Sequence, residues 1–245
     1  MSSGAKQLVQ IAKETVIGTV PSPFARQTLA FTDISLNQSV EKTESASITD
    51  NRLQQSSMIT SSEYSGELSA EAQYGAYDDL MAAAAFNAWA TNVLTFGGTT
   101  RQTFSVLLGY TDIANYHTFS GLHVNTFGID IPEAGLISLT FGFMGTKRTT
   151  AAVAPVGTIT PASSNPRMSN ISVGDLLVDG ASVKGTACIT AFSFNWDNSM
   201  QVRKCLGAGL EVGAILEMSA KGTGSFTMAW STKAAELYEK QFTNG

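Results

Sequence analysis

The sequence has little charge, few cysteines and no long apolar run. Lysine, arginine, aspartate and glutamate make up 14% of the 245 residues, against about 25% in typical soluble domains. With only two cysteines, Cys188 and Cys205, a disulfide framework is excluded, and we expect both as small buried side chains. No run of about 18 apolar residues occurs, which argues against a transmembrane helix. The polar first residues do not resemble a secretory signal.

The charge balance bears on the choice of partners. The net charge is −5 and the 15 basic residues are scattered, which argues against tight binding to nucleic acid, because such binding requires clustered lysine and arginine. An acidic surface that tolerates nucleic acid without holding it stays open. Interfaces are depleted in lysine, glutamate and aspartate. A weakly charged surface therefore favours a protein that is buried against copies of itself.

Alternation of apolar and polar residues dominates the chain. From Glu67 to Tyr74 the apolar residues Leu68, Ala70 and Ala72 fall on one side and the polar residues on the other, which is typical of a half-buried strand. Similar patterns predict strands over 28–36, 103–110, 136–144, 189–196, 210–219 and 224–231. The fold class is therefore mainly β.

Two helices and two irregular segments complete the prediction. The alanine-rich segment 77–90 predicts one packed α-helix, and 232–242 predicts a short C-terminal helix. Residues 1–27, with two prolines, are expected as an extended N-terminal arm ahead of a domain over 28–245. Residues 149–167, with three prolines, predict a long loop.

A possible internal repeat relates 28–90 to 186–242. A shift of 158 residues aligns FTDISLN (31–37) with ITAFSFN (189–195) and SGELSAEAQY (65–74) with TGSFTMAWST (223–232). Identities are few, and chance similarity stays open.

Motifs for catalysis or cofactor binding are absent. His117 and His123 are the only histidines and have no third ligand at metal-site spacing. The segment GAGLEVG (207–213) precedes a strand pattern and so lacks the helix that a phosphate loop needs. We expect no enzyme activity, no cofactor and no metal.

The order of elements resembles the tail tube proteins of long-tailed, non-contractile bacteriophages (siphophages). The resemblance rests on a G-x-L-x-x-E-x-x-Y pattern ahead of D-x-L, on F-S-F-x-x-D-N, and on a following Leu-Gly, supplied here by residues 66–80, 192–198 and 206–207. It implies a β-sandwich or partial barrel that forms rings, usually homohexamers. Members with fully duplicated tube domains form trimeric rings instead, and the possible internal repeat keeps that alternative open. The rings would stack into the tube through which DNA leaves the capsid.

The same resemblance implies partners and a location. The tube would surround a tape-measure protein and join tail-tip and tail-terminator proteins, while DNA passes without specific binding and no membrane is involved. Assembly would take place in the host cytoplasm, and the mature protein would lie in the tail of the virion. The N-terminal arm, the 149–167 loop and the C-terminal helix are expected to connect successive rings.

Acidic residues on the polar side of two predicted strands are the best candidates for the inner wall of a ring. They are Glu67, Glu71, Glu211 and Glu217. Carboxylates would repel phosphate and let DNA slide. Solvent-facing positions on an outer sheet remain the alternative for these four residues.

Two other functions fit the composition. One is a monomeric β-sandwich that binds carbohydrate or a host surface, although Trp89, Trp196 and Trp230 are predicted on apolar faces rather than in exposed loops. The other is a ring-forming tube protein of a contractile secretion system.

Overall fold

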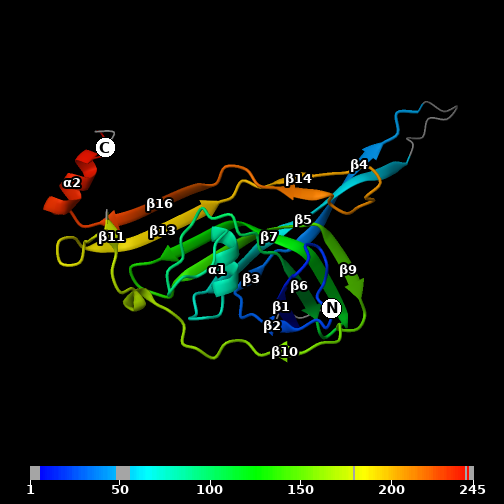
Figure 1. Cartoon of the computed structure of the whole chain (residues 1–245), viewed down its shortest axis with the longest axis horizontal. Coiled ribbons are helices and arrows are strands. Elements are labelled where there is room, and N and C mark those ends of the chain that lie inside the picture. The colour runs from blue at the N-terminus through cyan, green and yellow to red at the C-terminus, as the bar shows by residue number, and fades with distance from the viewer. Residues whose placement is uncertain (1–5, 48–55, 179, 241, 243–245) are drawn as a thin grey trace.

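The computed structural model describes residues 6–47, 56–178, 180–240 and 242 (Figure 1). Its helices are α1 (Asp78–Ala85), α2 (Thr232–Lys240) and the 3-10 turn η2 (Asn170–Ser172). The strands are β1 (Gln7–Lys13), β2 (Arg26–Thr28), β3 (Asp33–Ile34), β4 (Asn37–Glu44), β5 (Ser57–Glu71), β6 (Phe104–Tyr110), β7 (Asn115–Ile131), β8 (Ser138–Gly145), β9 (Lys147–Ala151), β10 (Ile159–Thr160), β11 (Leu177–Val178), β12 (Ala181–Ser182), β13 (Ile189–Asp197), β14 (Gln201–Arg203), β15 (Ala214–Leu216) and β16 (Lys221–Met228).

Twelve of the strands form one curled sheet, which confirms the prediction of a mainly β partial barrel. Its longest strand, β7, belongs to two halves. Residues 115–122 of β7 pair with β6 and β9, whereas residues 123–131 pair with β8 and β13. Gly121 lies at the change, with a φ of 64° and room for no Cβ because Thr146 Oγ1 would be 2.2 Å away. A glycine is therefore required where the strand turns from one half to the other.

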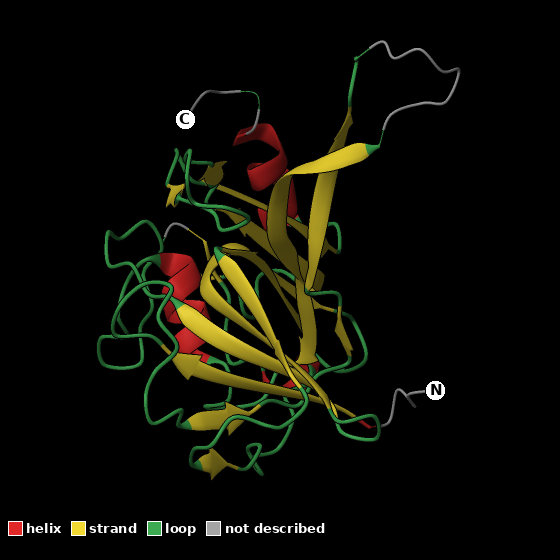
Figure 2. Ribbon diagram, turned by 90° about the vertical axis from the view of Figure 1, so that its right-hand side faces the viewer, coloured by secondary structure: helices red, strands yellow, loops and turns green. Residues whose placement is uncertain are grey.

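The core lies between the two halves of the sheet. Val9, Phe104 and Phe119 enter it from the β1–β6–β7 half, and Leu68 and Phe141 enter it from the β5–β8 half. Helix α1 packs against β7 and lies beside the sheet, as Figure 2 shows.

Helix α1 is built for burial rather than for solvent. Its alanines at 82, 83, 84 and 85 are all buried, since their small side chains let the helix approach the sheet closely. The helix ends at Phe86, which adopts a left-handed conformation. The buried Asn198 side chain then joins helix and sheet, because its Nδ2 donates to the carbonyls of Ala84 (3.0 Å) and Val124 (3.1 Å).

A buried carboxylate holds the start of the chain. Glu14 follows β1 and accepts four hydrogen bonds, from the backbone N–H groups of Gly18 and Gly121 and from the hydroxyls of Thr103 and Ser105. A buried charge is tolerated when its lone pairs are satisfied in this way. Glu14 thereby ties the turn after β1 to β6 and to the bend in β7.

Several predicted boundaries are wrong. The segment 1–27 is not only an extended arm, because β1 lies inside the sheet and buries Val9 and Ile11. The predicted strand 28–36 is divided into the end of β2 and the two-residue β3, and α1 ends at residue 85 rather than 90. The loop 149–167 contains the end of β9 and all of β10.

The predicted strand over 210–219 is also wrong in its length and its buried face. Only Ala214–Leu216 is a strand, and it pairs with the three-residue β14 alone. Val212 and Ile215 are buried, while Leu210, Leu216 and Met218 are exposed. Gly207 and Gly209 adopt positive φ before this segment, so the chain turns where the alternation suggested a continuous strand.

Strand register supports the internal repeat as a proposal. In the β3–β4–β5 region Asp33 pairs with Ser69 and Asn37 pairs with Ser65. A shift of 158 residues converts these into Ala191–Thr227 and Asn195–Thr223, which are observed pairs of β13 and β16. Each strand pair is followed by a helix, α1 in the first and α2 in the second.

Two elements project from the body. The β4–β5 hairpin extends at one end of the longest axis, and α2 lies at the opposite end (Figure 1). Both leave the compact region formed by the core and α1.

Candidate functional site: a polar sheet face and its edges

One face of the sheet carries small polar side chains over five strands. Opposed residues of an antiparallel pair project to the same face, so the register of β5, β8, β7, β13 and β16 defines rows across it. Three rows are Ser69, Thr140, Gly128, Asn195, Thr223; Glu71, Ser138, Asp130, Ser193, Ser225; and Glu67, Gly142, Thr126, Asp197, Lys221. No large apolar side chain occurs in these rows, which we call the polar face.

The polar face is acidic. Glu67 and Asp130 are exposed on it, and Asp33, which pairs with Ser69, adds a further carboxylate beside the rows. Lys221 is the only base in the three rows. Asp197 accepts a hydrogen bond from the backbone N–H of Ser199 (2.7 Å), which fixes the end of β13.

The four predicted wall residues are not brought together. Glu67 and Glu71 lie on the polar face, with Glu71 forming an ion pair with Arg167. Glu211 and Glu217 lie outside its rows, in the segment around β15. They are paired with Lys147 (2.5 Å) and Arg101 (2.5 Å) respectively. The strand on which Glu211 and Glu217 were placed is shorter than predicted, since only Ala214–Leu216 is a strand. The inner-wall role of all four residues stays a prediction.

Sequence reasoning missed three carboxylates of the polar face. They are Asp130 on β7, Asp197 on β13 and Asp33 beside the rows. Asp130 was overlooked because β7 was not predicted as a strand. The alternation of Val124, Phe127 and Ile129 with polar residues could have revealed it, but a bulge between residues 124 and 126 shifts the phase. Asp197 lies one residue beyond the predicted strand 189–196, whereas β13 includes it.

The strands that limit the polar face have free edges. Among the described residues, β16 pairs with β13 alone, and β3 and β4 pair with β5 alone. The neighbouring strands from β3 to β16 are antiparallel throughout, so these two edges run in opposite directions. The edge of a second copy could therefore continue the antiparallel order.

The histidines and cysteines form no site. His123 is buried with its Nδ1 3.0 Å from the carbonyl oxygen of Gly121, while His117 lies near Thr150. No group of three potential metal ligands occurs in the described part of the chain. Cys188 and Cys205 are both exposed, so the expectation that they are buried is wrong.

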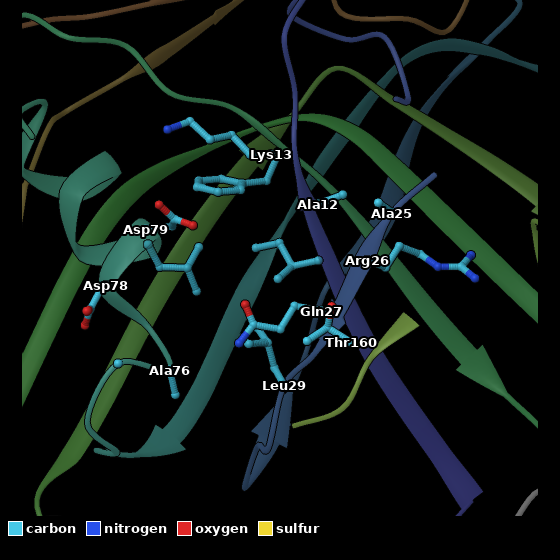
Figure 3. A pocket seen from close by; sticks show the side chains of 14 residues that line it. Ala12, Lys13, Ala25, Arg26, Gln27, Leu29, Ala76, Asp78, Asp79 and Thr160 are labelled. Carbon is cyan, nitrogen blue, oxygen red and sulfur yellow. The ribbon is translucent and has the colours of Figure 1, made fainter. Parts of the chain in front are cut away.

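The cavity between β1, β2 and α1 has a volume of about 320 Å³ and mixed polar and apolar walls. Figure 3 shows Lys13 and Asp79 at one side of it, whereas the Arg26 guanidinium points away. That guanidinium donates to the carbonyl of Pro155 (2.9 Å) and stacks over Phe24. The lining contains no histidine, cysteine or serine that could act as a nucleophile or base.

No helix among the described residues is long and apolar enough to cross a bilayer.

Trp230, which was predicted on an apolar face, is instead exposed at the start of the C-terminal segment.

Comparison with known proteins gives one match over nearly the whole chain. A family model described as phage tail tube protein matches residues 4–245, and no curated protein matches. Among solved structures, a chain of the anti-feeding prophage baseplate is 13% identical, with a TM-score of 0.43, over 62% of this chain and 97% of that one. A chain of the sheath-tube complex of the PVC extracellular contractile injection system is 12% identical, with a TM-score of 0.40, over 62% and 93%.

Proposed function

Because the chain belongs to the phage tail tube protein family, and is thus a component of a virion tail, we propose that its polar face lines the bore of a tube made from its own copies. The observation that carries this proposal is the composition of the face. Serine, threonine, asparagine and glycine cover five adjacent strands, while the opposite side of β5, β8, β7 and β13 faces the core.

Ring formation would use the free edges. The β16 edge of one copy would pair with the β3–β4 edge of the next, and every strand around the ring would remain antiparallel. Such head-to-tail contacts close into a ring when the rotation between copies allows it. The joined strands would leave neither of these two edges free, which removes their exposed N–H and C=O groups.

The charge of the polar face fits DNA as a passing cargo. Asp33, Glu67 and Asp130 repel phosphate, and the small hydroxyl and amide side chains present no cationic cluster that would hold it. Electrostatic repulsion acts over about 10 Å at 0.1 M salt, so carboxylates on a wall would act on DNA that does not touch them.

The finer assignment is a non-contractile siphophage tail with six copies per ring, enclosing a tape-measure protein and ending at tail-tip and tail-terminator proteins. It is supported by the resemblance of residues 66–80, 192–198 and 206–207 to that group. Host-cytoplasmic assembly belongs to the same assignment.

Cysteine labelling of assembled tubes tests the orientation. In a C188S/C205S background, Ser138→Cys places a thiol on the polar face and Thr99→Cys places one on the exposed loop after α1. Both should react with small and bulky maleimides in dispersed subunits. In tubes, Thr99→Cys should still react with both reagents, and Ser138→Cys only with the small one. Equal reaction of Ser138→Cys with the bulky reagent in tubes and in subunits would place the polar face outside and refute the proposal.

A further inference from the structure

The C-terminal segment presents three aromatic rings to solvent. Trp230, Tyr238 and Phe242 are 76%, 50% and 67% exposed and contact one another, with ring centroids 6.1 and 5.2 Å apart. The Trp230 Nε1–H and the Tyr238 hydroxyl are both hydrogen-bond donors. Exposed aromatic clusters of this kind mark interaction surfaces. We call these three residues the aromatic ladder.

An apolar pocket of about 440 Å³ lies beside the start of α1. That volume is within the range of sites that enclose large organic groups. Its wall is mainly carbon, contributed by Met81, Trp89, Ile129, Ile137, Leu139 and Met168. The two methionines can adapt to an incoming ring. We call it the Met81 pocket.

The Met81 pocket also contains an acceptor. Asp78 lines it, and burial raises the pKa of its carboxyl, with a further rise from the neighbouring Asp79 carboxylate. A donated hydrogen bond would relieve the lost hydration of the charged form. The aromatic ladder carries two donors of the required kind, the Trp230 Nε1–H and the Tyr238 hydroxyl.

The ladder and the pocket lie at opposite edges of the sheet and at the same strand end. Trp230 follows the edge strand β16, whereas Gln73, Tyr74 and Gly75 of the pocket follow β5, next to the other edge. Both come after the row that joins Glu71 to Ser225. Two copies joined edge to edge would therefore place the ladder of one copy and the pocket of the next at the same end of the shared edge.

The strand register of the possible internal repeat also supports a contact between the C-terminal segment and a second copy. The shift of 158 residues makes β16 and α2 the counterparts of β5 and α1. Helix α1 buries Leu80 and four alanines against its own sheet, whereas Ala234 is the only buried residue among those described in α2. Helix α2 therefore has no packing surface comparable to the sheet against which α1 is buried.

Resting on the ring assembly proposed above, we infer that the aromatic ladder of one copy inserts into the Met81 pocket of the next copy around the ring, with Trp230 or Tyr238 donating a hydrogen bond to Asp78. The occupant of the pocket is thus a second copy of this chain. Phe226 on β16 is also exposed, so the contact surface is continuous with the free edge.

Mixed-copy cross-linking tests this contact. In a C188S/C205S background, one preparation carries Glu239→Cys beside the intact ladder and another carries Tyr74→Cys at the rim of the pocket. The two carry tags of different length. After assembly of the mixture and mild oxidation, we expect a disulfide-linked heterodimer and little homodimer in either preparation alone. Glu239→Cys homodimers as the main product would indicate a symmetric contact between two helices and overturn the inference.

Substitution gives a second readout. The pair Trp230→Ala and Tyr238→Ala should raise the concentration needed for assembly at least tenfold while the circular dichroism spectrum stays unchanged, because both side chains are exposed. Ile113→Ala, an exposed apolar control in the turn between β6 and β7, should leave it unchanged. Tubes that form without the heterodimer would refute the ladder contact but leave the ring proposal standing. Absence of any ring or tube from the unmodified protein would refute both.

Discussion

Replacement of Glu14 should be among the most destabilising single changes in this protein. The side chain is 8% exposed, and its two oxygens accept hydrogen bonds of 2.6–2.9 Å from two hydroxyls and two backbone N–H groups. Glu14→Ala leaves the N–H groups of Gly18 and Gly121 without acceptors. Each unsatisfied buried donor costs about 1–3 kcal/mol, so we expect the free energy of unfolding to fall by about 3–5 kcal/mol.

Two comparison variants separate this network from a general loss of charge. Glu14→Gln keeps one acceptor oxygen but places an NH₂ group against groups that themselves donate hydrogen bonds. It should lower the free energy of unfolding by about 1–3 kcal/mol. Glu133→Ala removes an exposed glutamate and should stay within about 0.5 kcal/mol. Urea unfolding of dilute, unassembled protein, followed by circular dichroism, measures all three. A loss below about 1 kcal/mol for Glu14→Ala, or the same loss for Glu133→Ala, would show that the four hydrogen bonds do not stabilise the fold as argued.

Two further predictions concern the bend in β7 and the histidine near it. Gly121→Ala places a Cβ at a residue with positive φ and against Thr146, so it should lower the midpoint of thermal unfolding. The control Gly128→Ala, with no atom nearer than 3.7 Å to the added Cβ, should have little effect on that midpoint. Equal midpoints for the two variants would contradict the steric argument. Burial lowers the pKa of His123 below its usual 6.5. Below about pH 6.5 the unfolded chain therefore binds more protons than the folded chain, and the free energy of unfolding should decrease as the pH falls. Urea unfolding between pH 7 and 5.5 should show a smaller decrease for His123→Gln; an unchanged pH dependence would exclude the histidine as the cause.

Strict alternation predicted those strands that have one apolar and one polar face. Leu68 and Ala70 on β5, and Leu139 and Phe141 on β8, are buried as the sequence pattern indicates. Strands buried on both faces are harder to recognise, because their polar residues are also inside. Gln10 and Ser105 are examples, and β1 was accordingly mistaken for part of an arm.

The candidate site was predictable in kind but only partly in detail. A polar, acidic face opposite the core followed from Glu67 and Glu71, which lie in a regular strand. The strand predicted around Glu211 is too long, because its length depends on pairing with β14, which no local pattern reveals. The inner-wall role of Glu211 stays a prediction. The row structure of the polar face is set by register between strands far apart in sequence, and a single strand pattern contains no information about register.

The shared strand β7 determines how the molecule would bear force. A force applied to the polar face would be transmitted along the backbone of β7, through the bend at Gly121, to the half of the sheet that contains β6 and β9. Side-chain packing between the two halves would not have to resist this force alone. A force on the polar face would thus act on both halves together, and separation of one half from the other would require β7 itself to unfold.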